Sequence, residues 1–231
     1  MSERAGIMIP TIEASPEEIY DIELEHSLLE ANGKLAVANR ALLDRHGVTA
    51  VDFMGAIGSG KTTLITKLVE KLKSKIGVAV FNGDATTSDD ADGIARQNVP
   101  IVQIATVNGC HLDANLVGKA LGKIDLEELR LIFIENIGNL ICPAEFPLGS
   151  KARVVVISVT EGPWMVRKHP HMFLGAQIVV INKVDLAAAM EISIENLTRD
   201  VHTLKPDIQV IPTSTRTGAG LDEFAAALLA I

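Results

Sequence analysis

The chain has 231 residues, of which 48% are hydrophobic and 22% charged, and its formal net charge is −8 at pH 7. This length and apolar content are enough for one sizeable core, so we expect one domain with an extension rather than two full domains. The acidic charge, without a long Lys/Arg cluster, gives a nucleic-acid partner no electrostatic support, and no apolar stretch approaches the ~18 residues of a membrane span.

Residues 1–47 are predicted to form an N-terminal helical extension, and residues 48–231 the main domain. Residues 1–14 show no periodicity, whereas the next four, Ser-Pro-Glu-Glu from Ser15, supply an N-cap, a proline at the first helical position and a capping-box glutamate. Leucine and isoleucine at helical spacing continue to the end of this region, with Gly33 as an expected break or kink. Such a helix packs on the main domain or serves as a partner-binding arm, and packing is the commoner arrangement.

A glycine-rich loop follows the first expected strand, residues 48–54, and precedes an expected helix over 62–75. It reads G-A-I-G-S-G-K-T-T from Gly55, which matches the phosphate-binding pattern G-x-x-x-x-G-K-T. Its N–H groups would point at phosphate oxygens, the lysine would neutralise the outer phosphates, and the first threonine would bind Mg²⁺. The candidate nucleotide-binding residues are Gly58, Ser59, Gly60, Lys61, Thr62 and Thr63, with Lys61 also catalytic and Thr62 also a magnesium ligand. A plain turn between a strand and a helix is the alternative.

Further apolar runs alternate with segments of helical character along the rest of the chain. We expect strands buried on both faces at 78–81, 101–104, 131–134, 154–159, 178–181 and 208–211. We expect helices at 90–97, 113–121, 190–204 and 221–230. This alternation predicts an α/β fold with a mostly parallel sheet covered by helices on both faces, in which ligands bind at the carboxyl ends of the strands.

Acidic residues follow two of the expected strands. Asp84 and Asp89 come after 78–81, and either would orient the attacking water or hold Mg²⁺, although Asp89 could instead cap the next helix. Glu135 opens E-N-I-G at the place where most GTP-hydrolysing switches have D-x-x-G. A glutamate is one methylene longer than an aspartate and can still reach a water bound to Mg²⁺, so Glu135 is the third candidate catalytic carboxylate.

Only two cysteines are present, which is no disulfide framework and suits a reducing compartment, so we expect a cytoplasmic protein. Cys110 is followed by His111 after one strand, and Cys142 follows the Glu135 segment after another. Thiolate and imidazole ligands suit Ni²⁺ or Zn²⁺, but one chain gives three ligands and two chains give six. Two buried core cysteines without a metal are the alternative.

A second nucleotide motif follows the strand at 178–181. Asn182-Lys183-Val184-Asp185 reads N-K-x-D, in which the carboxylate of Asp185 accepts from both N1–H and N2–H₂ of guanine. Adenine presents the reverse edge and is rejected. Asn182 would bridge the base and the phosphate loop, and the stem of Lys183 would lie along the ring. Ser214 and Thr215 follow the strand at 208–211 and could bring a backbone N–H to guanine O6.

Together these motifs resemble the HypB family, the nickel-inserting GTPases of hydrogenase maturation, from about residue 35 to residue 223. The resemblance rests on the phosphate loop and N-K-V-D, and on G-D-x-x-T-x-x-D-A from Gly83, G-C-H-L-D from Gly109, E-N-I-G-N-L-I-C-P from Glu135 and S-V-T-E-G from Ser158. It implies a SIMIBI-type P-loop G domain that hydrolyses GTP with Mg²⁺ and forms a GTP-dependent homodimer. It further implies metal ligands at Cys110, His111 and Cys142, and hand-over to a companion nickel chaperone and the precursor of the [NiFe] hydrogenase large subunit.

Three other functions remain as alternatives. A urease-type nickel GTPase shares the fold, but its usual C-P-H tripeptide is absent because Ala144 follows Cys142-Pro143. A small-molecule kinase would use the same phosphate loop, and the guanine motif argues against it. A regulatory GTPase switch would keep both cysteines for structure only.

Overall fold

The computed structural model describes residues 11–13, 25–83, 93–94, 96–106, 111–139 and 145–231. Within these residues, eight strands form one sheet in the order β1-β4-β3-β5-β2-β6-β7-β8, and all neighbouring strands are parallel. The strands are β1 (Thr11–Glu13), β2 (Thr49–Met54), β3 (Val78–Asn82), β4 (Ile101–Ala105), β5 (Leu131–Glu135), β6 (Ala152–Ser158), β7 (Ile178–Asn182) and β8 (Gln209–Pro212). The α-helices are α1 (Glu25–Arg45), α2 (Lys61–Leu72), α4 (Ala114–Leu121), α5 (Met165–Lys168), α6 (Pro170–Leu174), α7 (Ile194–Leu204) and α8 (Leu221–Leu229).

The central strands are mostly apolar and buried, because helices cover both of their faces. Every residue of β3, β5 and β7 is buried, which is why these strands read as continuous apolar runs in the sequence. The expectation that residues 208–211 are buried on both faces is wrong. Residues 209–211 belong to β8, an edge strand with one neighbouring strand, in which Gln209 is exposed and Val210 is half-buried, and Ile208 precedes this strand.

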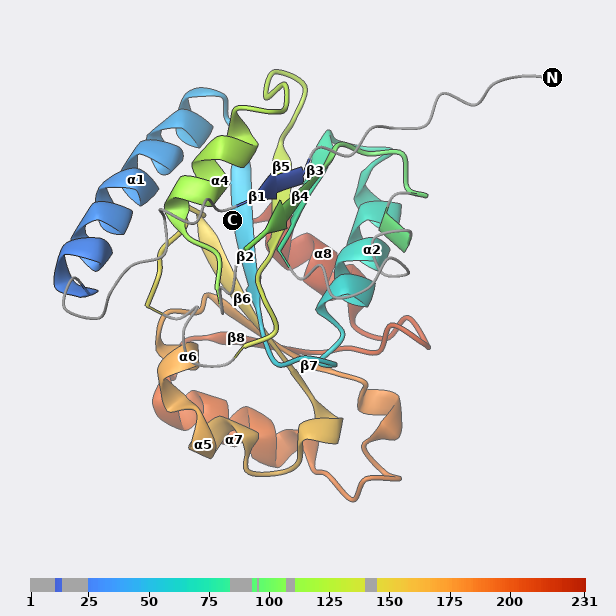
Figure 1. The fold of residues 1–231 in the computed structure, drawn as a ribbon. Coiled ribbons are helices and arrows are strands. Elements are labelled where there is room, and N and C mark those ends of the chain that lie inside the picture. Colours follow the sequence, from blue (N-terminus) through green and yellow to red (C-terminus); the bar gives the residue numbers. More distant parts are fainter. Residues whose placement is uncertain (1–10, 14–24, 84–92, 95, 107–110, 140–144) are drawn as a thin grey trace.

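Helices lie on both faces of the sheet (Figure 1), and three apolar clusters join them to it. The α2–α8 cluster covers one face without interruption, from Leu64 and Phe224 on the helices to strands β3, β5, β2, β6, β7 and β8. The other face carries two clusters. The α1–α4 cluster lies over β3, β4 and β5, and the α5–α7 cluster lies over β6 and β7. On this divided face, the side chain of Asp52 projects from the middle of β2 between the two clusters and is fully buried.

Helix α1 runs without a break through Gly33, so the expected break there is wrong. Three side chains of this helix hold it to the rest of the protein. Asn32 donates to the carbonyl of Pro147 (2.9 Å), Asn39 donates to the carbonyls of Ala114 and Leu148 (2.7 and 3.1 Å), and Arg40 donates to that of Ser150 (2.9 Å). These contacts on both sides of the glycine compensate for its low helix propensity. The start of the predicted helix at residue 15 lies outside the described residues.

The bounds of α2, α4 and α8 lie within a few residues of those predicted from the sequence. Helix α7 begins at Ile194 rather than at residue 190, because the hydroxyl of Ser193 accepts from the Asn196 N–H and caps it. Strand β1 and the short helices α5 and α6 were not expected. The helix expected at 90–97 lies mostly outside the described residues. No helix in the described part of the chain is both long and apolar enough to cross a bilayer.

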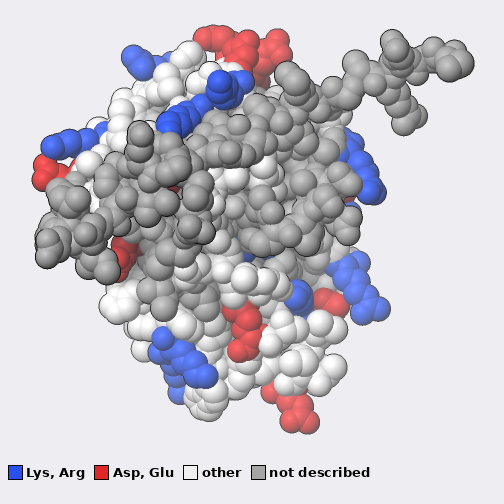
Figure 2. Space-filling view, viewed as in Figure 1, with Lys and Arg blue, Asp and Glu red and all other residues white. Residues whose placement is uncertain are grey.

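On the face seen in Figure 2, the drawn Lys and Arg side chains are scattered among acidic and uncharged residues.

Candidate functional site

The phosphate-loop residues lie between β2 and α2, at the carboxyl edge of the sheet. Gly60 adopts φ 97°, and a Cβ added there would meet Nδ2 of Asn182, so this position needs glycine for two separate reasons. Lys61 is almost fully buried, and its ammonium group donates to the carbonyls of Gly55 and Ala56 at 3.2 Å. The charge is thus held inside the loop, where a phosphate group would neutralise it.

The side chains of the other loop residues differ in exposure. Ser59 is fully buried, and within the described part of the chain its hydroxyl has no hydrogen-bond partner. A ligand could not reach that hydroxyl in this conformation, so Ser59 would contribute through its backbone. Thr63 is exposed and Thr62 is half-buried.

The Asn-Lys-x-Asp segment is bonded directly to this loop. Nδ2 of Asn182 donates to the carbonyl of Ser59 (2.9 Å), and Nζ of Lys183 donates to the carbonyl of Gly58 (2.6 Å). Lys183 has a left-handed backbone (φ 61°), which is uncommon for a residue with a side chain and is typical of sites that aim a side chain at a ligand. The two motifs, more than a hundred residues apart in sequence, therefore form one structural unit.

The carboxylate of Asp185 lies at the far end of this unit. Its side chain is 15% exposed, accepts from the Ser214 hydroxyl (2.6 Å) and lies 3.7 Å from the guanidinium of the exposed Arg216. Ser214 is fully buried, and Thr215 beside it is half-buried. The structure thus brings the two predicted base-reading segments together, since Thr213 also donates from its hydroxyl to Oδ1 of Asn182 (3.2 Å).

Thr62 and Glu135 meet between α2 and the end of β5. The threonine hydroxyl donates to Oε1 of the glutamate at 2.5 Å, and Glu135 is fully buried. A buried carboxylate beside a hydroxyl is a pair of hard oxygen donors, which is the type of ligand that Mg²⁺ prefers. Thr62 and Glu135 are therefore chemically suited to Mg²⁺, while the other two predicted magnesium ligands, Asp84 and Asp89, lie outside the described residues.

Glu161 is a further carboxylate at this edge, and sequence reasoning did not select it. It closes a capping box after β6, in which its Oε1 accepts from the Ser158 N–H (2.9 Å) and Ser158 pairs in register with Asn182. Its other oxygen is buried without a hydrogen-bond partner among the described residues. Burial raises the pKa of Glu161 to about 7, although the charges of Lys183 and Lys61 act in the opposite direction. The Ser-x-x-Glu spacing is a signal that could have found it.

His111 is the one predicted cargo ligand that the structure describes. Its ring stacks on that of Phe146, with ring centroids 3.8 Å apart and planes inclined by 23°. Burial lowers the pKa of His111, with the charges of Asp113 and Glu145 opposing the shift, and this direction favours the neutral ring, which is the form that binds metals. Within the described ranges, no three His, Cys, Asp or Glu residues are grouped as a metal site.

Four predicted site residues, Asp84, Asp89, Cys110 and Cys142, lie outside the described residues. The described chain next to them is nevertheless held in place. Helix α1 contacts the first residue of α4 through Asn32 and Asn39, and these same two residues contact positions 147 and 148. One helix thereby fixes the ends of both segments that carry the candidate metal ligands. In the sequence, this anchoring role of α1 is indicated only by two asparagines seven positions apart, which places them on one face of the helix.

An all-parallel sheet with a glycine-rich phosphate loop bonded to an Asn-Lys-x-Asp segment defines a P-loop NTPase. The family model described as "CobW/HypB/UreG, nucleotide-binding domain" matches residues 49–212. The chain belongs to this family and, within it, to the HypB proteins, as the following relatives show.

A probable hydrogenase maturation factor HypB from Methanocaldococcus jannaschii is 46% identical over 87% of this chain and 91% of its own length. The crystal structure of the hydrogenase maturation factor HypB from Archaeoglobus fulgidus has a TM-score of 0.83 at 39% identity, covering 87% of this chain and 98% of that chain. The crystal structure of HypB from Helicobacter pylori in complex with nickel has a TM-score of 0.81 at 31% identity, covering 87% of this chain and 94% of that chain.

Proposed function

We propose that the protein binds and hydrolyses GTP, and that its nucleotide state controls the binding and hand-over of nickel during hydrogenase maturation. The observation that carries the nucleotide part is the pair of hydrogen bonds from Asn182 and Lys183 to the phosphate loop, at 2.9 and 2.6 Å. They fix the segment that carries Asp185 relative to the phosphate loop, so that its carboxylate would read a base whose phosphates lie in the loop. Guanine offers that carboxylate two donors and adenine offers none in the same place.

The chemistry needs positioning and charge neutralisation more than covalent participation by the protein. Lys61 would neutralise the outer phosphates, and Thr62 with Glu135 would hold Mg²⁺, which supplies further neutralisation of phosphate charge when bound. Asp84 or Asp89 would orient the attacking water or complete the magnesium site. Ser214 and Thr215 would border the base, and Gly58, Ser59, Gly60 and Thr63 would surround the phosphates.

Nickel would be the cargo, bound by Cys110, His111 and Cys142, and Zn²⁺ would compete for the same ligands. The support is the half-buried ring of His111 in this chain, whose pKa is lowered by burial, and the nickel in the solved H. pylori relative. Three ligands from one chain leave a tetrahedral ion one short, so a GTP-dependent homodimer, in which each protomer offers the same patch, would complete the site.

The names of the relatives support the place of this activity in hydrogenase maturation. A companion nickel chaperone and the precursor of the hydrogenase large subunit would then receive the metal, in the cytoplasm. Residues 1–47 would form the extension and residues 48–231 the GTPase domain. A second role in urease maturation has one specific support, since the H. pylori relative, 32% identical over 90% of this chain, is called a hydrogenase/urease maturation factor. A switch with purely structural cysteines is the remaining alternative.

The nucleotide part is tested by steady-state hydrolysis of GTP and ATP under identical Mg²⁺ concentrations. We expect kcat/KM to favour GTP by about 10⁴-fold, the penalty for leaving buried polar groups of a site unmatched. Comparable values for the two nucleotides would contradict the proposal.

The cargo part is tested by Ni²⁺ and Zn²⁺ titration and by analytical ultracentrifugation, with GDP or a non-hydrolysable GTP analogue. Cys142→Ala and His111→Ala should lower the metal stoichiometry. The control His46→Ala, which removes a histidine paired with Glu127, should not. A wild-type protein that stays monomeric in every condition, or a Cys142→Ala variant with unchanged metal stoichiometry, would refute the shared site.

A further inference from the structure

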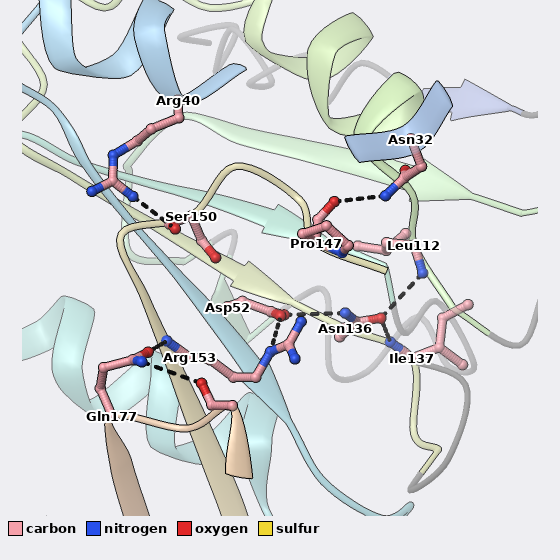
Figure 3. A network of polar contacts seen from close by, with 11 residues as sticks. Asn32, Arg40, Asp52, Leu112, Asn136, Ile137, Pro147, Ser150, Arg153 and Gln177 are labelled. Carbon is pink, nitrogen blue, oxygen red and sulfur yellow. Dashed lines mark hydrogen bonds and ion pairs between the residues drawn. The ribbon is translucent and has the colours of Figure 1, made fainter. Parts of the chain in front are cut away.

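The side chain of Asn136 joins the nucleotide-binding edge to the segment that leads into α4 (Figure 3). Its Oδ1 accepts from the backbone N–H of Leu112 (3.1 Å) and from that of Ile137 (3.0 Å), and its Nδ2 donates to Oδ1 of Asp52 (3.1 Å). Asn136 is fully buried. A buried amide with both ends bonded has one favourable position, because any displacement leaves a donor or an acceptor without a partner.

The orientation of this amide is fixed by the charge behind it. Asp52 is held on its other oxygen by Nε of Arg153 (3.1 Å), and burial raises its pKa while Arg153 and Asn136 counteract that rise. A reversed amide would set its NH₂ group against two backbone N–H groups and its oxygen against a carboxylate. The acceptor of Asn136 therefore faces Leu112.

The chain around Asn136 also contacts the nucleotide-binding elements at three points. Glu135 accepts from Thr62, and Asn139 forms an isolated bridge with Gly55. Gly138 packs so closely on the phosphate loop that an added Cβ would meet the side chain of Ile57 and lie 3.1 Å from its backbone N. A rearrangement of the loop or of the Thr62–Glu135 pair must therefore displace residues 135–139.

On its other side, Asn136 fixes the residue next to the candidate cargo ligand. Leu112 is fully buried and directly follows His111. From the opposite direction, Asn32 and Asn39 on α1 hold the first residue of α4, at Ala114. Residues 112–114 are thus held at two points. Asn136 holds Leu112 and is connected to the nucleotide-binding elements, whereas Asn32 and Asn39 of α1 hold Ala114 and, among the described residues, are not.

We propose that Asn136 is the positioning residue through which nucleotide occupancy changes the affinity of the His111 site for its metal cargo. This inference rests on the proposed function and adds to it the residue that transmits the change. Coupling between two sites in proteins is typically about 5-fold to 150-fold in affinity, and by reciprocity the metal changes the nucleotide affinity by the same factor.

The test measures Ni²⁺ affinity by titration calorimetry for the full-length protein, alone and saturated with Mg²⁺ and a non-hydrolysable GTP analogue. In the wild type we expect the two dissociation constants to differ at least 5-fold. Asn136→Ala, which loses the acceptor, should reduce that ratio to below about 2-fold. Asn136→Asp keeps an acceptor towards Leu112 and can share one proton with Asp52, so it should retain the coupling.

Asn39→Ala is the matched control, because it removes another buried asparagine that is hydrogen-bonded to the start of α4, and its bonds to Ala114 and Leu148 do not reach the nucleotide-binding elements. It should change Ni²⁺ affinity equally in both nucleotide states and leave the ratio unchanged. If Asn136 had only a structural role, Asn136→Ala would also change Ni²⁺ affinity equally in both nucleotide states. An unchanged ratio in Asn136→Ala would therefore overturn the inference and leave the proposed function standing. A wild type that binds no Ni²⁺, or binds it equally in both states, overturns both.

Amide hydrogen exchange at Leu112 gives an independent readout without nickel and without any variant. We expect the GTP analogue to change the exchange rate of this amide in the wild-type protein, since its acceptor moves with residues 135–139. An exchange rate that is the same with and without the analogue would overturn the inference, even if Asn136→Ala proved too unstable to study.

Discussion

Replacing Glu161 by Gln should remove a pH dependence from the stability of the nucleotide-free protein. Burial raises the pKa of this carboxyl from 4.5 to about 7 in the folded chain. Between these values the folded protein holds a proton that the unfolded chain has lost, so stability falls as the pH rises through this window. Gln keeps the acceptor for the Ser158 N–H and cannot ionise.

The magnitude follows from the size of the shift. At about 1.4 kcal/mol for each pKa unit, a rise from 4.5 to about 7 corresponds to about 3 kcal/mol, which we reduce to about 2 kcal/mol because the side chain is only partly buried. The difference in unfolding free energy between Glu161→Gln and wild type should therefore change by about 2 kcal/mol in favour of the variant between pH 5 and pH 8.

Urea denaturation at pH 5 and pH 8 measures this difference. His111, whose lowered pKa makes stability rise with pH, contributes equally to both proteins and cancels. Glu195→Gln is the control, since hydrogen bonds from its own backbone N–H and from Ser193 lower the pKa of the exposed Glu195. Glu195 therefore titrates below this pH range, and the effect of its replacement should be nearly the same at pH 5 and pH 8. If the unfolding free energies of the wild type and of Glu161→Gln differ by the same amount at pH 5 and at pH 8, the raised pKa of Glu161 is refuted.

Three further predictions concern the nucleotide site. Asp185→Asn should lower GTP turnover and favour xanthosine triphosphate, because the amide donates where the carboxylate accepted, and parallel kcat/KM measurements with the two nucleotides check this. Lys61→Ala should abolish hydrolysis and Thr62→Ala should raise the Mg²⁺ concentration needed for half-maximal rate; near-normal turnover in either variant would mean that the loop binds another ligand. Gly60→Ala should destabilise the protein by about 2 kcal/mol in urea denaturation, because it strains a left-handed position and displaces Asn182, and it should weaken GTP binding in fluorescence titration. Unchanged stability and affinity would contradict the close contact between the two motifs.

The parallel sheet and both nucleotide motifs could be predicted because each strand and each motif has a recognisable pattern within a short stretch of sequence. A buried parallel strand such as residues 178–182 is a continuous apolar run, and the motif that follows it has fixed spacing. Strand β1 could not be predicted in the same way, since three residues carry too little pattern and its pairing with β4 comes from the fold. Gly33 was misjudged because tertiary hydrogen bonds, not local propensity, hold α1 together.

The link through Asn136 was beyond sequence reasoning for a different reason. Its partner Asp52 lies 84 positions away, and Arg153 lies 101 positions from Asp52, so neither contact has a local signal. Glu161 was detectable in principle, since its distance from Ser158 is that of a capping box. Its burial beside the two lysines, which gives it an unusual pKa, follows only from the three-dimensional arrangement.

The division of one face of the sheet into two apolar clusters gives the molecule two different mechanical behaviours. On the undivided face, the side chains of the α2–α8 cluster interlock from β3 to β8, so a displacement at one end is felt at the other. On the opposite face, Asp52 interrupts the apolar packing between β5 and β6, and the two halves meet there through a few directional polar bonds. The half that carries His111 is therefore joined to the half that carries Asn182 by apolar packing on one face of the sheet and by polar bonds on the other. Under the proposed function, this arrangement would let the cargo side change its packing on the divided face while the base-binding side keeps its own.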